Sequence, residues 1–418
     1  MGATLNLATI AGNSSAITLA AGGRLETVVA NFGGSVNTNR VYGCDGANRG
    51  FEFDGTVYCP IATGMTSDIP THVTAHKNQL FFSFVGSVQH SAPGTPYIWS
   101  AVLGATEIAM GDTVTGFKPQ PGSETSGALA IFTRNRTSIL YGTGVSNWVL
   151  TPYREELGAY AHTIQDIAHT VFLDDRGITN FQTAQAYGNF AHAALSSKVK
   201  SWLNTQRTKA TASCVVRNKN QYRLFFSDGY ALYVTMAGPK VVGMMQVYMV
   251  DEARCAWSTE ESDGTESIYF GSDDGFVYQM EKGTSFDGDA IEHYLHLAWD
   301  SLNSPRVIKD FVECAFEVTG TGYASWDFTF ELDYASTQIE PPSTQAVTLE
   351  SLASLVWDGA GVVWDSLFWD ARSAQNAVAD MEGSGAMLGL IIRGSSDYHE
   401  ALRFTGLHVM YKPRRLIH

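Results

Sequence analysis

A short unit of apolar and polar positions recurs along much of the chain without repeating exactly. Each copy is an aromatic or β-branched run, a turn containing Gly, Asp or Asn, and a second such run. The pattern occurs about six times between Val41 and Met280, and its clearest copies are Val41–Tyr58, Gln79–Phe84, Thr137–Leu150, Thr170–Phe181, Gln221–Val234 and Ser267–Met280. Short runs joined by Gly-containing turns at regular spacing are typical of radial antiparallel sheets. We therefore expect a mainly β protein with a β-propeller of about six blades over residues 41–290.

Residues 1–40 read as rich in strands but have few turn signals. This segment either closes the propeller or lies outside it, and the two alternatives leave a blade count of five, six or seven open.

Beyond residue 290 the pattern changes to longer strands that alternate cleanly. In WDFTFELDY the apolar residues Trp326, Phe328, Phe330, Leu332 and Tyr334 alternate with polar ones. The same alternation places Val312, Cys314, Phe316 and Val318 opposite Glu313 and Glu317, and it recurs at Leu407, Val409 and Tyr411. Such strands have one face on a core and one in water. We expect residues 291–418 to form a separate β-sandwich.

One segment has helical rather than β periodicity. Between Phe190 and Leu203, an apolar stripe is formed by Leu195, Val199, Trp202 and Leu203, spaced as on one helix face. The sequence therefore predicts one short helix after the strand pair at residues 170–181.

A Trp-rich stretch at residues 354–371 interrupts the predicted sandwich. It holds Trp357, Trp364 and Trp369, each followed by Asp, but at a spacing too short for WD40 blades. The stretch is predicted to be a loop or an arm. Its indoles either fill the sandwich core or dock on a neighbouring subunit, where Trp is favoured at interface centres.

Composition describes a folded protein with an acidic balance. The 418 residues are 44% hydrophobic and 17% charged, with a net charge of −15. Proteins that hold DNA phosphates tightly are usually basic, whereas an acidic wall suits a conduit through which DNA slides. Five scattered Cys residues read as free, mostly buried thiols of a reducing cytoplasm, with a Cys44–Cys59 contact across a hairpin as the alternative. No signal peptide and no run long enough to span a membrane is expected.

Charges of opposite sign are separated along the chain. Residues 176–227 contain no Asp or Glu but eight Lys and Arg, including Lys198, Lys200, Arg207 and Lys209. Residues 251–292 contain twelve acids against Arg254 and Lys282. These blocks are either ordinary solvated surface, a subunit interface matched by charge, or a surface that faces DNA.

Searches for catalytic patterns find little. His72 and His76 lack the Glu between them that a zinc hydrolase needs, and no nucleophile elbow or phosphate loop occurs. Asp273-Asp274-Gly275 and Asp287-Gly288-Asp289 have too few ligands for calcium loops and fit hairpin turns. We expect no catalytic residues, no metal and no cofactor, so the protein is not expected to be an enzyme.

Several segments, in order, resemble the tail hub proteins of tailed bacteriophages, also called nozzles or packaged-DNA stabilisation proteins. The resemblance covers most of residues 30–335 and rests on Gly33–Ile61, His76–Pro96, Val114–Gly144, Leu173–Asn204 and His293–Gly320. In the last segment Asn303 takes the Gly position of a typical GSPRxxKxF motif. None of these motifs is catalytic.

The resemblance implies a structural virion protein, assembled in the bacterial cytoplasm into a ring, usually hexameric, of the phage tail. Such a ring lies below the portal and head–tail adaptor, extends the DNA channel, helps retain the genome until ejection and carries fibres or spikes. Double-stranded DNA would pass through it without sequence-specific binding, and no membrane partner is implied. Candidate subunit or adaptor contacts are Lys198, Lys200, Arg207, Lys209, Trp357, Trp364 and Trp369.

Two alternatives come from other classes. One is a propeller that binds or hydrolyses host glycans, because aromatic and acidic residues suit sugar stacking and acid–base chemistry. The other is a propeller adaptor for proteins, with no path for DNA.

Overall fold

The computed structural model divides into two compact units, Met1–Glu281 and Lys282–His418, here called unit 1 and unit 2. The structure describes residues 4–8, 14–35, 38–120, 127–181, 195–249, 251–320, 324–334, 344–349, 374–396 and 402–416.

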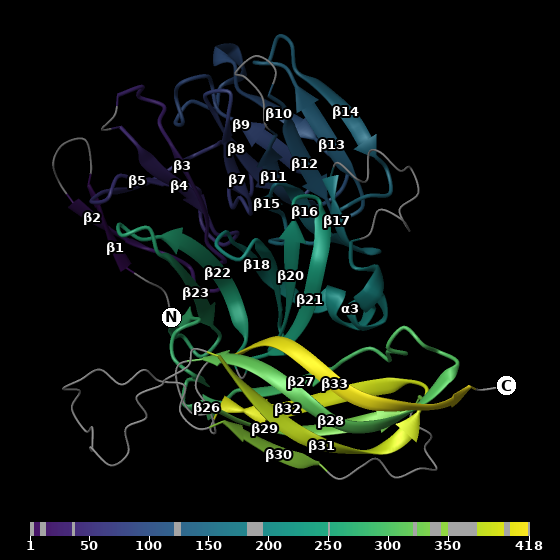
Figure 1. Cartoon of the computed structure of the whole chain (residues 1–418). Coiled ribbons are helices and arrows are strands. Elements are labelled where there is room, and N and C mark those ends of the chain that lie inside the picture. Colours follow the sequence, from purple (N-terminus) through teal and green to yellow (C-terminus); the bar gives the residue numbers. More distant parts are fainter. Residues whose placement is uncertain are drawn as a thin grey trace. The chain divides into compact units, whose positions relative to one another are not determined.

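Unit 1 is a succession of small antiparallel sheets that follow one another in chain order (Figure 1). It opens with the hairpin β1 (Thr4–Ala8) and β2 (Ser14–Thr18). The first sheet is then β3 (Glu26–Ala30), β4 (Arg40–Cys44), β5 (Phe51–Phe53) and β6 (Tyr58–Pro60). The second sheet is β7 (Val73–His76), β8 (Gln79–Phe84), β9 (Ser87–His90) and, after the 3-10 turn η1 (Ala101–Leu103), β10 (Thr106–Ala109).

Four more sheets complete unit 1, each a meander of neighbouring strands. The third sheet is β11 (Val114–Pro119), β12 (Leu129–Thr133), β13 (Thr137–Tyr141) and β14 (Val149–Arg154). The fourth is β15 (Gln165–Ile167), β16 (His169–Asp174) and β17 (Gly177–Asn180). The fifth is β18 (Ala210–Val216), β19 (Gln221–Phe226), β20 (Tyr230–Ala237) and β21 (Lys240–Tyr248). The sixth is β22 (Ala253–Glu260), β23 (Glu266–Ser272) and β24 (Val277–Met280).

Tight turns of predictable chemistry connect these strands. Between β7 and β8, Lys77 and Asn78 both have positive φ, 49° and 56°. His76 pairs directly with Gln79, so these two residues form a two-residue hairpin loop of the kind that matches strand twist. Asp274 organises the β23–β24 turn, because its carboxylate accepts hydrogen bonds from the Phe276 amide at 2.9 Å and the Tyr278 hydroxyl at 2.7 Å.

Five apolar clusters join the six sheets, one between each sheet and the next. Their central strands are therefore buried on both faces, which explains why they read as continuous apolar runs. On β8, Leu80 and Phe82 face the first sheet whereas Phe81 faces the third. On β12, Phe132 meets Phe172 of the fourth sheet, with ring centroids 5.1 Å apart.

The predicted helix is shorter at its N-terminal end than the apolar stripe indicates. The 3-10 turn η2 (Ser197–Val199) leads into α3 (Lys200–Gln206), and a second 3-10 turn, η3 (Arg207–Lys209), follows. Leu195 and Ser196 are not helical because they bind strand β17: the Leu195 amide donates to the Ile178 carbonyl at 2.7 Å, and the Ile178 amide donates to Ser196 Oγ at 2.9 Å. Residues 182–194 lie outside the described part of the chain.

The apolar stripe itself packs as predicted. Leu203 is fully buried, and Leu195, Val199 and Trp202 cover the cluster between the fourth and fifth sheets.

Unit 2 has two antiparallel sheets that share one apolar core. The first has the order β27 (Glu292–His296), β32 (Leu388–Ser395), β29 (Ala324–Leu332) and β30 (Gln345–Leu349). The second has the order β31 (Ala374–Gly385), β28 (Val307–Gly320) and β33 (Leu402–Leu416). A small hairpin, β25 (Ser285–Phe286) with β26 (Asp289–Ala290), precedes them.

The alternation predicted for residues 326–332 is confirmed. Trp326, Phe328 and Phe330 are buried against Phe316 and its neighbours on β28. Two inward positions are wrong, however. Tyr334, beyond the end of β29, is 64% exposed; Val312 is 41% exposed, and Phe311 is buried instead. The register of β28 shifts between Phe311 and Glu313 against both of its partners. A bulge of this kind reverses the facing of the residues on one side of it.

No helix in the part of the chain that the structure describes has the length and apolar character needed to cross a membrane.

Candidate functional site

Lys198 and Lys200 lie on the η2–α3 segment and are exposed, pointing off its apolar stripe. Among the described residues, no salt bridge to either ammonium group is found. Both ammonium groups are therefore exposed on this segment.

Arg207 and Lys209 of η3, in contrast, already have partners within unit 1. The Arg207 guanidinium donates to the Asp175 carbonyl, and Lys209 Nζ lies 2.7 Å from Asp228 Oδ2. The predicted anchors Trp357, Trp364 and Trp369 lie outside the described residues.

Part of the charge separation along the sequence is matched inside the chain. Lys219 and Arg223 of the fifth sheet both bind Glu281, which follows the sixth sheet. Glu266 accepts hydrogen bonds from the amides of Arg217 and Asn218, both at 2.8 Å. The basic and acidic blocks thus join neighbouring sheets of one molecule.

The motif SPRVIKDF at residues 304–311 has a structural explanation in unit 2. Lys309 is fully buried, and its Nζ donates to the carbonyls of Ser304 at 2.8 Å, Val307 at 3.1 Å and Ala386 at 2.9 Å. All three of its hydrogens are therefore used to close the loop onto strand β28.

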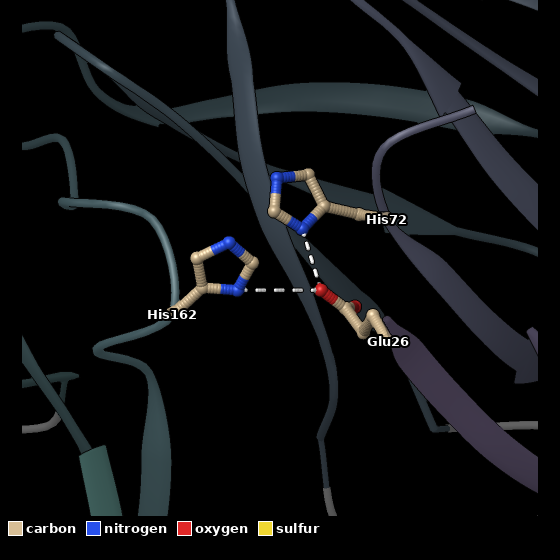
Figure 2. A group of neighbouring side chains, drawn as sticks. All are labelled: Glu26, His72 and His162. Atoms are coloured by element: carbon tan, nitrogen blue, oxygen red, sulfur yellow. Dashed lines mark hydrogen bonds and ion pairs between the residues drawn. The ribbon is translucent and has the colours of Figure 1, made fainter. Parts of the chain in front are cut away.

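Among the residues that the structure describes, Glu26, His72 and His162 of unit 1 form a group of three potential metal ligands (Figure 2). Glu26 begins β3 of the first sheet, His72 precedes β7 of the second, and His162 precedes β15 of the fourth. One potential ligand atom from each lies within 4.8 Å of those of the other two. Three sheets therefore bring the starts of their first strands to one point.

Both imidazoles are directed at the same carboxylate oxygen (Figure 2). His72 Nδ1 lies 2.7 Å from Glu26 Oε2, and His162 Nδ1 lies 3.7 Å from it. The other carboxylate oxygen, Oε1, accepts from the Val73 amide at 3.3 Å. His72 is buried, whereas the side chains of Glu26 and His162 retain 28% and 23% exposure, so water can reach the cluster.

One backbone contact positions His162, and a second set of contacts links the first sheet to the fifth and sixth. His162 has a left-handed backbone with φ 61°, and its carbonyl accepts from Ser213 Oγ of the fifth sheet at 2.8 Å. Arg24, two residues before Glu26, donates to the Thr211 carbonyl at the start of β18. Thr211 Oγ1 in turn donates to the Ala253 carbonyl of the sixth sheet at 2.7 Å.

The electrostatics favour neutral imidazole at His162. Burial, together with the positive charge of Arg24 and the neighbouring His72, lowers the pKa of His162 to about 3. Burial also lowers the pKa of Arg24, although Cys255 and Glu26 oppose that effect. A neutral ring nitrogen can accept a hydrogen bond or bind a metal ion.

Sequence reasoning missed this cluster. The sequence pairs His72 only with His76, as a possible metal-binding pair. The ring of His76 lies instead beside Phe81 and Trp148. Glu26 and His162 carry no motif, since their partners come from other sheets. The cysteines, by comparison, are all free, with Cys44, Cys214 and Cys314 buried.

Comparison with protein-family models and with curated proteins found no match. Among solved structures, the crystal structure of BBS1N in complex with ARL6DN, soaked with mercury, has a TM-score of 0.41 and 11% identity, covering 61% of this chain and 77% of that chain. The same complex soaked with lead has a TM-score of 0.39, with 10% identity and coverage of 60% and 76%. The structure of U3-55K has a TM-score of 0.38, with 10% identity and coverage of 58% and 72%. Likeness of this degree adds nothing to what the sheets of this chain indicate.

Proposed function

We propose that the chain is a structural subunit of a bacteriophage tail: a hub or nozzle protein that forms a homo-oligomeric ring around the DNA path. In this proposal unit 1 is a closed propeller of six blades and unit 2 is a β-sandwich. The ring joins the portal and adaptor to fibres or spikes, retains the packaged genome and supports its ejection.

The single observation that carries the proposal is the ordered resemblance of five segments to tail hub proteins. The proposal is supported by the order of the resembling segments, which span successive sheets of unit 1 and the start of unit 2. The last of them contains Lys309, whose buried ammonium group donates hydrogen bonds to main-chain carbonyls and so gives that motif a structural role.

Closure of unit 1 is supported by contacts between sheets that are distant in the chain. Glu26 of the first sheet reaches the fourth through His162, and Arg24 beside it reaches the fifth through Thr211. Apolar clusters already join each sheet to the next. A radial arrangement satisfies both sets of contacts, since it brings the first strands of all blades to one axis.

DNA would pass between subunits rather than through unit 1. Side chains of three sheets approach within 4.8 Å at the Glu26–His72–His162 cluster, which is far narrower than a duplex. The net charge of −15 suits a ring whose bore repels the phosphate backbone and so does not hold DNA tightly. The exposed ammonium groups of Lys198 and Lys200 are the contacts to a subunit or adaptor that we favour.

Native mass spectrometry and electron microscopy of the purified full chain test the proposal. Six copies of the 45.4-kDa chain would form a ring of about 270 kDa with an open centre. The proposal fails if the chain stays monomeric at high concentration and does not bind portal–adaptor particles. A monomer that releases reducing sugar from bacterial polysaccharide would instead support the glycan-hydrolysing alternative.

A further inference from the structure

The Glu26–His72–His162 cluster contains the donor types that bind zinc in proteins. Two imidazoles and one carboxylate form the protein ligand set of many mononuclear zinc sites, with water in the fourth position. We propose that these three residues bind one divalent transition-metal ion of the zinc class, which cross-links the first, second and fourth sheets of unit 1. This proposal does not depend on the tail-hub proposal.

The distances suit such an ion with small adjustments. Zinc ligands at about 2.0–2.2 Å from a tetrahedral ion are separated from one another by about 3.3 Å. The two imidazole nitrogens lie 2.7 Å and 3.7 Å from the shared carboxylate oxygen, on either side of that value. Both nitrogen–oxygen distances are thus within about 0.6 Å of the value for a bound ion, and the two imidazole nitrogens lie within 4.8 Å of each other, so small side-chain rotations would bring the three donors around one ion.

The site is held from several directions before any ion arrives. His162 adopts a positive φ of 61°, and the hydrogen bond from Ser213 to its carbonyl fixes that backbone. The Val73 amide holds one oxygen of Glu26 and leaves the other for the imidazoles. A non-glycine residue in this conformation at a group of converging polar side chains is typical of functional sites.

The donor set also selects the class of ion. Imidazole nitrogen suits zinc and its first-row neighbours, whereas calcium and magnesium prefer oxygen ligands alone. The side chains of Glu26 and His162 are partly exposed, so solvent can supply the water that would complete the coordination.

The positive charge of Arg24, two residues before Glu26, opposes a cation at the cluster. Its charge acts on both Glu26 and His162, although its guanidinium is directed to the Thr211 carbonyl. Replacing it by a neutral side chain should therefore strengthen metal binding, in contrast to replacements of the ligands themselves.

The experiment measures Zn²⁺ binding to the chelator-treated full chain by isothermal titration, together with the shift in melting temperature. We expect one Zn²⁺ per chain and a higher melting temperature. Glu26→Gln and His162→Gln should weaken binding by more than the roughly 10–100-fold that loss of an outer-shell partner costs. Arg24→Gln should tighten it. His169→Gln, in β16 and outside the cluster, serves as the matched control and should leave binding unchanged.

Two results would overturn the proposal: no stoichiometric Zn²⁺ binding by the wild-type chain, or binding that survives both ligand substitutions. Should those variants fail to fold, Co²⁺ bound to the wild-type chain decides the matter. A tetrahedral absorption spectrum with nitrogen and oxygen ligands is required, and an octahedral or absent spectrum rejects the site.

Discussion

Arg223 of β19 is buried to 1% exposure and forms an ion pair with Glu281 at the end of the sixth sheet. Its guanidinium also lies 4.1 Å from the centre of the Tyr233 ring and binds Gln221 Oε1 at 2.8 Å. Because Glu281 is one-third exposed and also binds Lys219, a single carboxylate connects a buried and a solvated cation.

Glu281→Gln should lower the free energy of unfolding by about 2 kcal/mol, since it leaves a buried guanidinium without its counter-charge. Lys219→Met removes only the exposed partner of the same carboxylate and should cost less than about 1 kcal/mol. Urea unfolding followed by fluorescence measures both. Equal losses for the two variants would contradict the distinction between the buried and the exposed pair.

Lys309→Met should destabilise unit 2 by about 2 kcal/mol, because three main-chain carbonyls lose their donor. Arg306→Met, three residues earlier and exposed, is the matched control and should change stability little. Thermal unfolding monitored by calorimetry compares them. A Lys309 variant as stable as the wild type would show that the buried ammonium group does not hold this loop.

Lys198→Glu with Lys200→Glu should leave the monomer folded, since both side chains are exposed and lie off the stripe formed by Leu203 and its neighbours. If the tail-hub proposal holds, the double variant should weaken ring formation or adaptor binding through charge reversal. Light scattering coupled to size-exclusion chromatography measures the assembly. Lys240→Glu, an exposed charge in another sheet, is the control. Unchanged assembly would remove this segment from the proposed interface.

Acid should weaken unit 1 partly through His76. Burial, with a smaller contribution from Lys77, lowers the pKa of His76 to about 4 from 6.5. Below about pH 6.5 the unfolded chain binds a proton that the folded chain cannot, so stability falls between about pH 6.5 and pH 4, by up to about 3 kcal/mol. His76→Gln should flatten this part of the pH profile, measured as the urea midpoint against pH. An identical slope in the variant would exclude His76 as a cause.

The recurring unit predicted a mainly β chain with many short antiparallel strands, and the structure confirms this. The strand at Gln79–Phe84 could be predicted from its continuous apolar run, because both of its faces are buried. The strand at Trp326–Leu332 could be predicted from its alternation, because only one of its faces is buried. The bulge at Val312 could not be predicted from the sequence, since a register shift depends on how β28 pairs with its two partner strands.

The candidate site could not be predicted from the sequence for a related reason. Motifs report residues that are close in the chain, whereas Glu26, His72 and His162 meet only through the packing of three sheets. Likewise, Arg223 belongs to the basic block of residues 176–227, which was expected to lie on a surface of one kind or another, but it is buried and forms an ion pair with Glu281 of the next sheet. The exposure of Lys198 and Lys200 could be predicted, because helical periodicity places both residues off the apolar stripe.

The left-handed backbone of His162, tied to Ser213 of the fifth sheet, has a consequence for biosynthesis. Glu26 leaves the ribosome with the first sheet, before either of its imidazole partners. His72 follows just ahead of the second sheet, and His162 only just ahead of the fourth. Even then, the main chain around that imidazole gains its anchor only when the following sheet is complete. The Glu26–His72–His162 cluster can therefore form only after most of unit 1 has been synthesised and assembled. A chain truncated before the fifth sheet would lack the anchored cluster.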